Sequence, residues 1–196
     1  IRKNKLKVKK VLFTSSSAVY GNIADTPRRE DMPVSLENPY AIDKFASERY
    51  AMFYEKVYGI PTVAVRFFNV YGPRQKAQGK SAGVCAIILD CLLNDKEFRL
   101  NGDGKQTRDY MYVTDAVDAT LMLLKDPQIS GKIFNVASGK SVSLIDLIVA
   151  FEEITGKKLK IIHNTKLEKT GFLPKYTFES GLRQYVKEEK RRLGYS

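Results

Sequence analysis

Two short apolar runs on either side of one long helical segment constrain the fold most strongly. The runs at 8–15, VKKVLFTS, and 60–70, IPTVAVRFFNV, are continuous in apolar character and do not alternate with polar residues. Such runs are typical of strands buried on both faces, as in a parallel sheet. Between them, Asn38 is a good N-cap, Pro39 suits the first helical position and Gly59 suits the C-cap. We therefore predict a strand, a helix and a second strand.

The rest of the chain continues this alternation. We expect helices over about 83–94, from the cap Thr114 to Leu124, from the cap Ser143 to Gly156, and after the cap Thr177. The expected strands are 98–100, 108–113, 132–138 and 158–163, and a glycine-rich loop covers 71–83. Strands that alternate with helices across short loops predict an α/β fold with a largely parallel sheet.

Composition narrows the class of protein. With 196 residues and 43% apolar content, the chain can form one domain, or one domain and a small lobe. The net charge of +11 would suit a nucleic-acid partner, but much of it lies in 1–10 and 187–192, where we favour solvated surfaces. RNP, zinc-finger and helix-turn-helix signatures are absent, so we expect no nucleic acid partner. Without a membrane-length apolar run or a signal-peptide pattern at the start, we expect no membrane association and a cytoplasmic location.

The cysteines and the histidine indicate neither a disulfide nor a metal site. Cys85 and Cys91 lie six positions apart on different faces of one expected helix, so we expect no mutual disulfide. With His163 as the one histidine, they cannot supply a plausible zinc site.

A tyrosine, a lysine and a cluster of serines are the candidate catalytic residues. Tyr40 and Lys44 share one face of the first helix. The serines at 15–17 end the first strand, and Asn69 lies near the end of the second, at the same edge of a parallel sheet. A tyrosine, whose usual pKa is about 10, becomes a better base beside an ammonium group. An amphipathic helix with a solvated lysine is the alternative interpretation.

Four motifs in a fixed order carry a family resemblance. The motifs are SSSAVYG, ENPYAIDKFASE, VAVRFFNVYGPRQ and GDGKQTRDYMYVTDAVDA. With these motifs, the chain from about Val11 to Leu182 resembles the extended short-chain dehydrogenase/reductases that act on nucleotide sugars, and most closely the UDP-glucose 4-epimerase group. The resemblance implies the C-terminal part of a Rossmann-like doubly wound parallel sheet plus a small mixed α/β lobe. Residues 1–70, with about 110–137 packing back on them, would belong to the NAD-binding domain, and 71–196 mainly to the nucleotide-sugar-binding lobe.

The resemblance also implies roles for single residues. Tyr40 would be the catalytic base and Lys44 its helper, and Ser16 would be the catalytic serine, four residues before the tyrosine of VYG. Tyr40, Lys44, Ser15 and Phe67 would bind the cofactor, NAD. The substrate, a UDP-sugar, would be held by Ser16, Ser17, Asn69, Arg108 and Arg74. For Arg74, a loop arginine that holds carbonyl groups is an equally good interpretation.

The implied reaction is NAD-dependent epimerisation at C4 of UDP-glucose and UDP-galactose, or of the N-acetyl pair, through a transient 4-keto sugar. Related dehydratases carry Thr-Asp-Glu where this chain has Ser16, Ser17 and Ala18, and decarboxylases carry a glutamate in this loop. Another dehydratase or reductase of the family remains an alternative, as does a non-catalytic remnant that binds nucleotide sugars. The family suggests a homodimer; the aromatic residues at 50–58 are compatible with this and equally with core packing.

Two departures from the family pattern concern missing segments. The family's N-terminal portion, with its glycine-rich nucleotide loop, has no counterpart, and an Arg-Pro-Gly-Asp segment is missing between His163 and Asn164. A sheet this incomplete would leave one side uncovered, so we expect the 196 residues to be part of a longer protein.

Overall fold

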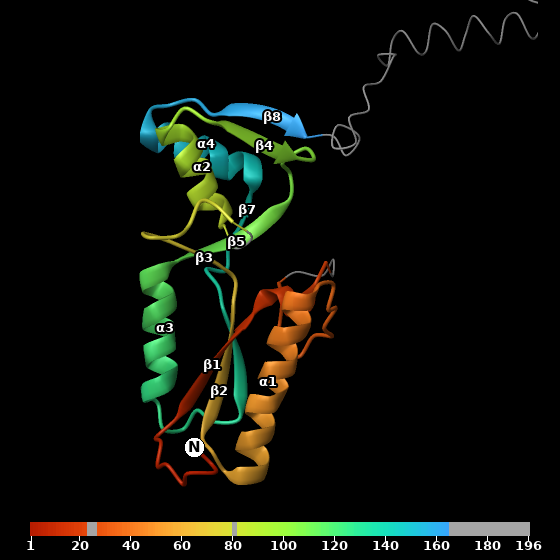
Figure 1. Ribbon diagram of the computed structural model, residues 1–196, viewed down its shortest axis with the longest axis vertical. Coiled ribbons are helices and arrows are strands. Elements are labelled where there is room, and N and C mark those ends of the chain that lie inside the picture. The colour runs from red at the N-terminus through yellow and green to blue at the C-terminus, as the bar shows by residue number, and fades with distance from the viewer. Residues whose placement is uncertain (23–26, 80–81, 165–196) are drawn as a thin grey trace, which may run out of the picture. The chain divides into compact units, whose positions relative to one another are not determined.

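The computed structural model describes residues 1–22, 27–79 and 82–164 (Figure 1). The chain divides into two compact units. The first consists of 1–98 and 104–160, and the second of 99–103 and the residues from 161 onwards. The first unit holds every residue of the candidate site.

A parallel sheet of three strands forms the base of the first unit. Its order is β1 (Val11–Ser16), β2 (Thr62–Phe67), β6 (Lys132–Val136), and all neighbours are parallel. The register pairs Ser16 with Phe67 and Phe67 with Val136, so the three strands end at one edge. This confirms the predicted α/β fold with its parallel sheet.

Helices α1 (Pro39–Tyr58) and α3 (Val113–Lys125) lie on opposite sides of these strands (Figure 1). Side chains of successive strand residues point to opposite faces. Val65 of β2 accordingly packs with Ala116 and Leu123 of α3, whereas its neighbour Arg66 pairs with Glu48 of α1. Successive residues of β2 therefore contact different helices, α3 on one face of the sheet and α1 on the other.

The ends of α1 confirm the caps predicted for this helix. The Asn38 side-chain oxygen accepts a hydrogen bond from the Ala41 amide at 2.9 Å, and Pro39 occupies the first turn. Gly59 ends the helix with a left-handed φ of 63°, and its amide donates to the Glu55 carbonyl. The two caps fix where the helix begins and ends.

The second predicted strand is divided in the structure. β2 stops at Phe67, and after Phe68 the chain enters a second sheet as β3 (Asn69–Tyr71). That sheet has the order β3, β5 (Thr107–Tyr112), β7 (Ser141–Ser143), with β3 and β5 parallel and β5 and β7 antiparallel. Phe68 donates its amide hydrogen to the Val136 carbonyl of β6, so the break keeps the chain bonded to the first sheet.

The remaining elements complete both units. The first unit contains the short 3-10 helix η1 (Ser17–Tyr20), α2 (Val84–Leu93) and α4 (Leu144–Thr155). Ser143 caps α4 as predicted, because its hydroxyl accepts from the Asp146 amide at 3.0 Å. Thr114 does not cap α3: the helix begins one residue before it, and the N-cap, Tyr112, makes no side-chain bond. β4 (Glu97–Asn101) and β8 (Lys160–Asn164) form a two-stranded sheet, and Thr177 lies outside the described residues.

Two negative findings concern metals and membranes. In the described ranges, His, Cys, Asp and Glu side chains do not gather in threes in a way that would hold a metal ion. The described helices also include none that combines the length and apolar composition of a membrane span. Cys85 and Cys91 are free thiols buried in α2, and burial raises the pKa of Cys85 to about 11.

Candidate active site

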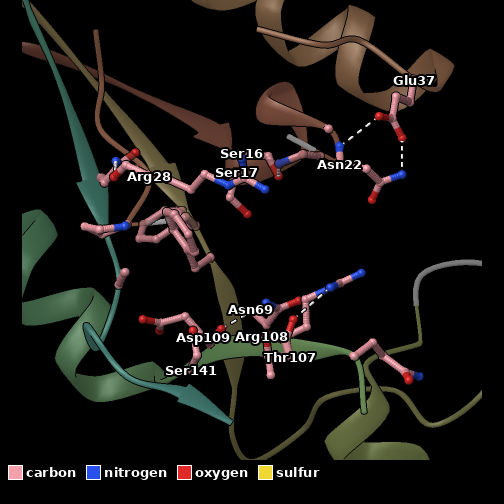
Figure 2. Close-up of a pocket in the computed structure, with 18 of the residues that line it drawn as sticks. Ser16, Ser17, Asn22, Arg28, Glu37, Asn69, Thr107, Arg108, Asp109 and Ser141 are labelled. Carbon is pink, nitrogen blue, oxygen red and sulfur yellow. Dashed lines mark hydrogen bonds between the residues drawn. The ribbon is translucent and has the colours of Figure 1, made fainter. Parts of the chain in front are cut away.

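A cavity of about 800 Å³ opens where β1, β2 and β6 end (Figure 2). Residues from the ends of all three strands, from η1, from the start of α1 and from β5 line it. Its wall includes Ser16, Ser17, Asn22, Arg28, Glu37, Tyr40, Phe67, Asn69, Arg108, Asp109 and Asn135. Ligands of open α/β sheets bind outside the carboxyl ends of the strands, which is where this cavity lies.

Ser16 marks the point where β1 turns into η1. Its hydroxyl oxygen accepts a hydrogen bond from the Ala18 amide at 3.2 Å and so caps the short helix. This bond uses a lone pair of the oxygen and leaves the hydroxyl hydrogen free to donate to a ligand. Ser17, the next residue, lies on the same wall.

Tyr40 and Lys44 are brought together as the helical spacing predicts. The Tyr40 side chain lies on the cavity wall and is 54% exposed. The Lys44 ammonium lies 5.8 Å from the centre of the Tyr40 ring and donates to the Thr14 carbonyl of β1 at 2.9 Å. The lysine is thereby held between the helix and the strand, with its positive charge beside the tyrosine.

Asn69, Arg108 and Phe67 lie on the cavity wall as well. The Asn69 amide group donates to the Asp109 carbonyl at 2.9 Å, which links β3 to β5. Arg108 is exposed and donates to the Thr107 carbonyl beside it, so most of its guanidinium is available to a ligand.

The structure does not bring Ser15 and Arg74 to the cavity wall. Ser15 precedes Ser16 by one residue, and strand alternation turns its side chain toward α1, where it is only 3% exposed. Arg74 lies in the turn after β3 with a left-handed φ of 67°. Their sequence-based binding roles receive no support from this geometry.

A buried ion pair between α1 and β2 is a feature that the motifs did not indicate. Glu48 is fully buried and Arg66 is 2% exposed, and two hydrogen bonds of 2.9 and 2.8 Å join them. Arg66 also donates to the Tyr20 hydroxyl at 2.8 Å, and Tyr20 donates to Asn135 at 2.8 Å. The network ties the helix that carries Tyr40 to β2, η1 and β6. A charged residue inside the apolar run VAVRFF was the available sequence signal.

The electrostatics of this pair favour the ionised forms. Burial by itself raises the pKa of Glu48. The hydrogen bonds and the positive charge of Arg66, with smaller contributions from Ser15 and Arg49, lower it by more, so the pKa of Glu48 lies below its usual value. Burial alone lowers the pKa of Arg66, and Glu48 and Tyr20 reverse that effect, so the guanidinium stays charged.

Other carboxylates at the cavity hold its loops in place. Glu37 accepts from both the backbone and the side-chain amide of Asn22, at 2.8 and 2.5 Å. Asp109 accepts from the Ser138 and Gly139 amides at 2.8 and 2.7 Å. These acids are occupied by amide donors of the protein, as the dashed lines in Figure 2 show for Glu37.

Two guanidinium groups of the cavity wall could bind a negatively charged ligand. Arg28 and Arg108 both lie on its wall, and among the described ion pairs neither has a carboxylate partner. Guanidinium groups match phosphate and carboxylate oxygens well. The donor set therefore suits the diphosphate of a nucleotide or dinucleotide.

Comparison with known proteins identifies the family. Residues 1–137 match the model of the NAD dependent epimerase/dehydratase family. The chain is 41% identical to a UDP-glucose 4-epimerase of Mycolicibacterium smegmatis, in an alignment that covers 76% of this chain. It is 32% identical to a putative UDP-glucose 4-epimerase of Methanocaldococcus jannaschii, in an alignment that covers 93% of this chain. It spans 47% and 63% of these two relatives. Other relatives are a nucleotide-sugar decarboxylase and sugar-nucleotide 4,6-dehydratases.

Solved structures agree with the family match. The UDP-glucose 4-epimerase of Thermotoga maritima, solved with UDP-glucose, superimposes with a TM-score of 0.72 at 32% identity, over 95% of this chain and 65% of that one. The UDP-glucose 4-epimerase of Thermus thermophilus, solved with NAD, superimposes with a TM-score of 0.71 at 31% identity, over 89% of this chain and 61% of that one. These matches confirm the predicted Rossmann-like fold and the family's cofactor, NAD. The chain belongs to the NAD-dependent epimerase/dehydratase family of short-chain dehydrogenase/reductase enzymes.

Proposed function

We propose that the protein is an NAD-dependent 4-epimerase of UDP-sugars, acting on UDP-glucose and UDP-galactose or on the N-acetyl pair. The observation that carries the proposal is that Tyr40 and Ser16 line one cavity, with the Lys44 ammonium beside the tyrosine ring. A hydroxyl base, a second hydroxyl that can hold a sugar oxygen and a nearby positive charge are the groups that alcohol oxidation requires.

Each of these residues has one task in the proposed reaction. Tyr40 takes the proton from the sugar 4-hydroxyl, and Ser16 donates a hydrogen bond to the same oxygen. Lys44 stabilises the phenolate through its charge. Lys44, at the nicotinamide ribose, and Phe67 would hold NAD, which would supply the hydride acceptor and donor for C4 of the sugar.

Asn69 and Arg108 anchor the nucleotide in this proposal. Both lie near Asp109 on the wall formed by β3 and β5, away from the serines of β1 (Figure 2). The exposed fork of Arg108 suits the diphosphate, whose retention would allow the sugar to turn between the two hydride transfers. Ser17 and Ser16 would meet the sugar at the other wall.

The loop after β1 favours epimerisation over the dehydratase and decarboxylase alternatives. A dTDP-D-glucose 4,6-dehydratase of Homo sapiens is 33% identical over 72% of this chain, so family membership alone does not separate the reactions. Elimination of water requires an acid and a base near C5 and C6. This chain has Ser17 and Ala18 where the dehydratases carry that acid pair.

Product analysis tests the proposed reaction. We expect a proton NMR time course of the purified protein with NAD and UDP-glucose, or separately UDP-N-acetylglucosamine, to show the 4-epimer accumulating until the two epimers reach equilibrium. The sugar that reacts faster identifies the preferred pair. A 4-keto-6-deoxy product or unchanged sugars in every mixture would contradict the proposal.

We also propose a homodimer formed through α1. Its outer face exposes large side chains, with Tyr50 at 68%, Phe53 at 49% and Val57 at 52%. A contiguous exposed apolar face on one helix is typical of a protein interface.

We expect sedimentation of the protein to give a dimer, and Tyr50→Glu with Phe53→Glu to give a monomer. Ile154→Glu, at an 83% exposed site on α4, serves as the control and should stay dimeric. A monomeric wild-type protein would contradict this interface.

A further inference from the structure

Arg28 is a charged residue at the cavity that the proposed reaction does not use. It lies on the cavity wall after the loop that follows η1, and in Figure 2 its side chain extends into the cavity on the side of Ser16 and Ser17. Its Nη1 atom is buried, and no atom of the described residues accepts a hydrogen bond from it. The ion pairs found within those residues do not involve this guanidinium either.

The backbone of Arg28 is held firmly. The Asn135 side chain of β6 donates to the Arg28 carbonyl at 2.9 Å, and the Asn135 amide donates to the Glu30 carboxylate at 2.6 Å. Asn135 is in turn bonded to Tyr20 of the buried Arg66 network. Arg28 therefore extends from a fixed base, so little ordering is needed when its guanidinium binds a ligand.

The described acids form no ion pair with Arg28. Glu37 is occupied by Asn22, Asp109 by two backbone amides, and Asp31 by Arg29. Because Arg28 lines the cavity and has no carboxylate partner among the described residues, its guanidinium can pair with an anion that enters the cavity. Since Arg108 lies on the other wall with Asn69, a diphosphate held there leaves the charge of Arg28 for a different part of the ligand.

We propose that Arg28 binds an anionic substituent of the sugar itself, a carboxylate on the hexose, and that the site therefore accepts acidic nucleotide sugars as well as the neutral pairs proposed above, and binds the acidic ones more tightly. The inference rests on the proposed function, which places the sugar beside Ser16 and Ser17. A planar guanidinium can donate two parallel hydrogen bonds to a carboxylate, whereas it offers a neutral hydroxymethyl group a single weaker contact.

Calorimetric titration of the protein, with NAD present, tests this site. The probes are UDP, UDP-glucose and UDP-glucuronate. We expect UDP-glucuronate to bind about tenfold more tightly than UDP-glucose, and Arg28→Gln to remove that difference. UDP, which has no hexose, should bind the variant as it binds the wild type. Arg28→Lys should keep part of the preference, because it keeps the charge and loses the paired geometry.

Arg29→Gln is the matched control. Arg29 is adjacent, exposed and paired with Asp31, and its substitution should leave all three affinities unchanged. Equal wild-type affinities for UDP-glucuronate and UDP-glucose would overturn the proposal, as would an equal loss of UDP and UDP-glucuronate binding in Arg28→Gln. Absence of UDP binding by the wild type would overturn the proposed function as well, so the two failures are distinguishable.

Discussion

Tyr40→Phe is expected to lower the rate of epimerisation by about 10²–10⁴-fold, the usual contribution of a positioned acid–base group. The substitution removes the hydroxyl placed on the cavity wall beside the Lys44 ammonium and leaves the ring in place. The proposed nucleotide anchors Asn69 and Arg108 lie on the strand pair β3–β5 and are unchanged. Affinity for UDP should therefore stay the same while the turnover number falls.

Tyr112→Phe is the control for this experiment. Tyr112, at the end of β5, is 39% exposed, does not line the cavity and lies outside the proposed dimer face, so its hydroxyl should not affect turnover. Wild-type rates in Tyr40→Phe would remove the tyrosine from the reaction and with it the mechanism proposed above. A fall in UDP affinity equal to the fall in rate would indicate a damaged site.

Glu48→Gln is expected to lower the free energy of unfolding by about 3–5 kcal/mol, because it leaves the charge of Arg66 buried without its counter-ion. Arg66 is 2% exposed and makes two hydrogen bonds to Glu48. Chemical denaturation measures the loss. Replacing both partners, as in Glu48→Leu with Arg66→Met, should cost less than the single change, because no unpaired charge remains.

The control for Glu48→Gln is Glu153→Gln, at an exposed position of α4, which should change stability by less than about 0.5 kcal/mol. The pH dependence gives a second check. The pKa of Glu48 is lower in the folded than in the unfolded protein, so its stabilisation is present above the unfolded value and is lost as the pH falls through the folded value. Glu48→Gln should remove this part of the acid sensitivity. Unchanged stability would show that the pair contributes little.

The elements that the sequence predicted well are those with strong local signals. The continuous run before Ser16 predicted β1, and Asn38, Pro39 and Gly59 marked the ends of α1, since caps and apolar runs act over a few residues. The spacing of Tyr40 and Lys44 likewise predicted their shared face, which the structure confirms.

The features that escaped prediction depend on distant parts of the chain. The break at Phe68 depends on the pairing of β3 with β5, a strand far along the chain, which no local pattern reveals. The pairing of Arg66 with Glu48 and the position of Arg28 on the cavity wall depend on the placement of loops and strands far apart in sequence. For Ser15 the prediction failed for a local reason. Its side chain lies on the face of β1 that is turned toward α1, because side chains alternate along a strand, so it does not reach the cavity.

The most direct test of the central claim follows the hydrogen at C4. In epimerisation this hydrogen leaves as hydride and returns to the same carbon, so it never exchanges with water. UDP-glucose, and separately UDP-N-acetylglucosamine and UDP-glucuronate, deuterated at C4 can be incubated with the protein and NAD in ordinary water and examined by NMR. The proposed epimerisation predicts a 4-epimer that retains its deuterium at C4. Loss of the deuterium to solvent, or its appearance at another carbon of a dehydrated sugar, would contradict it.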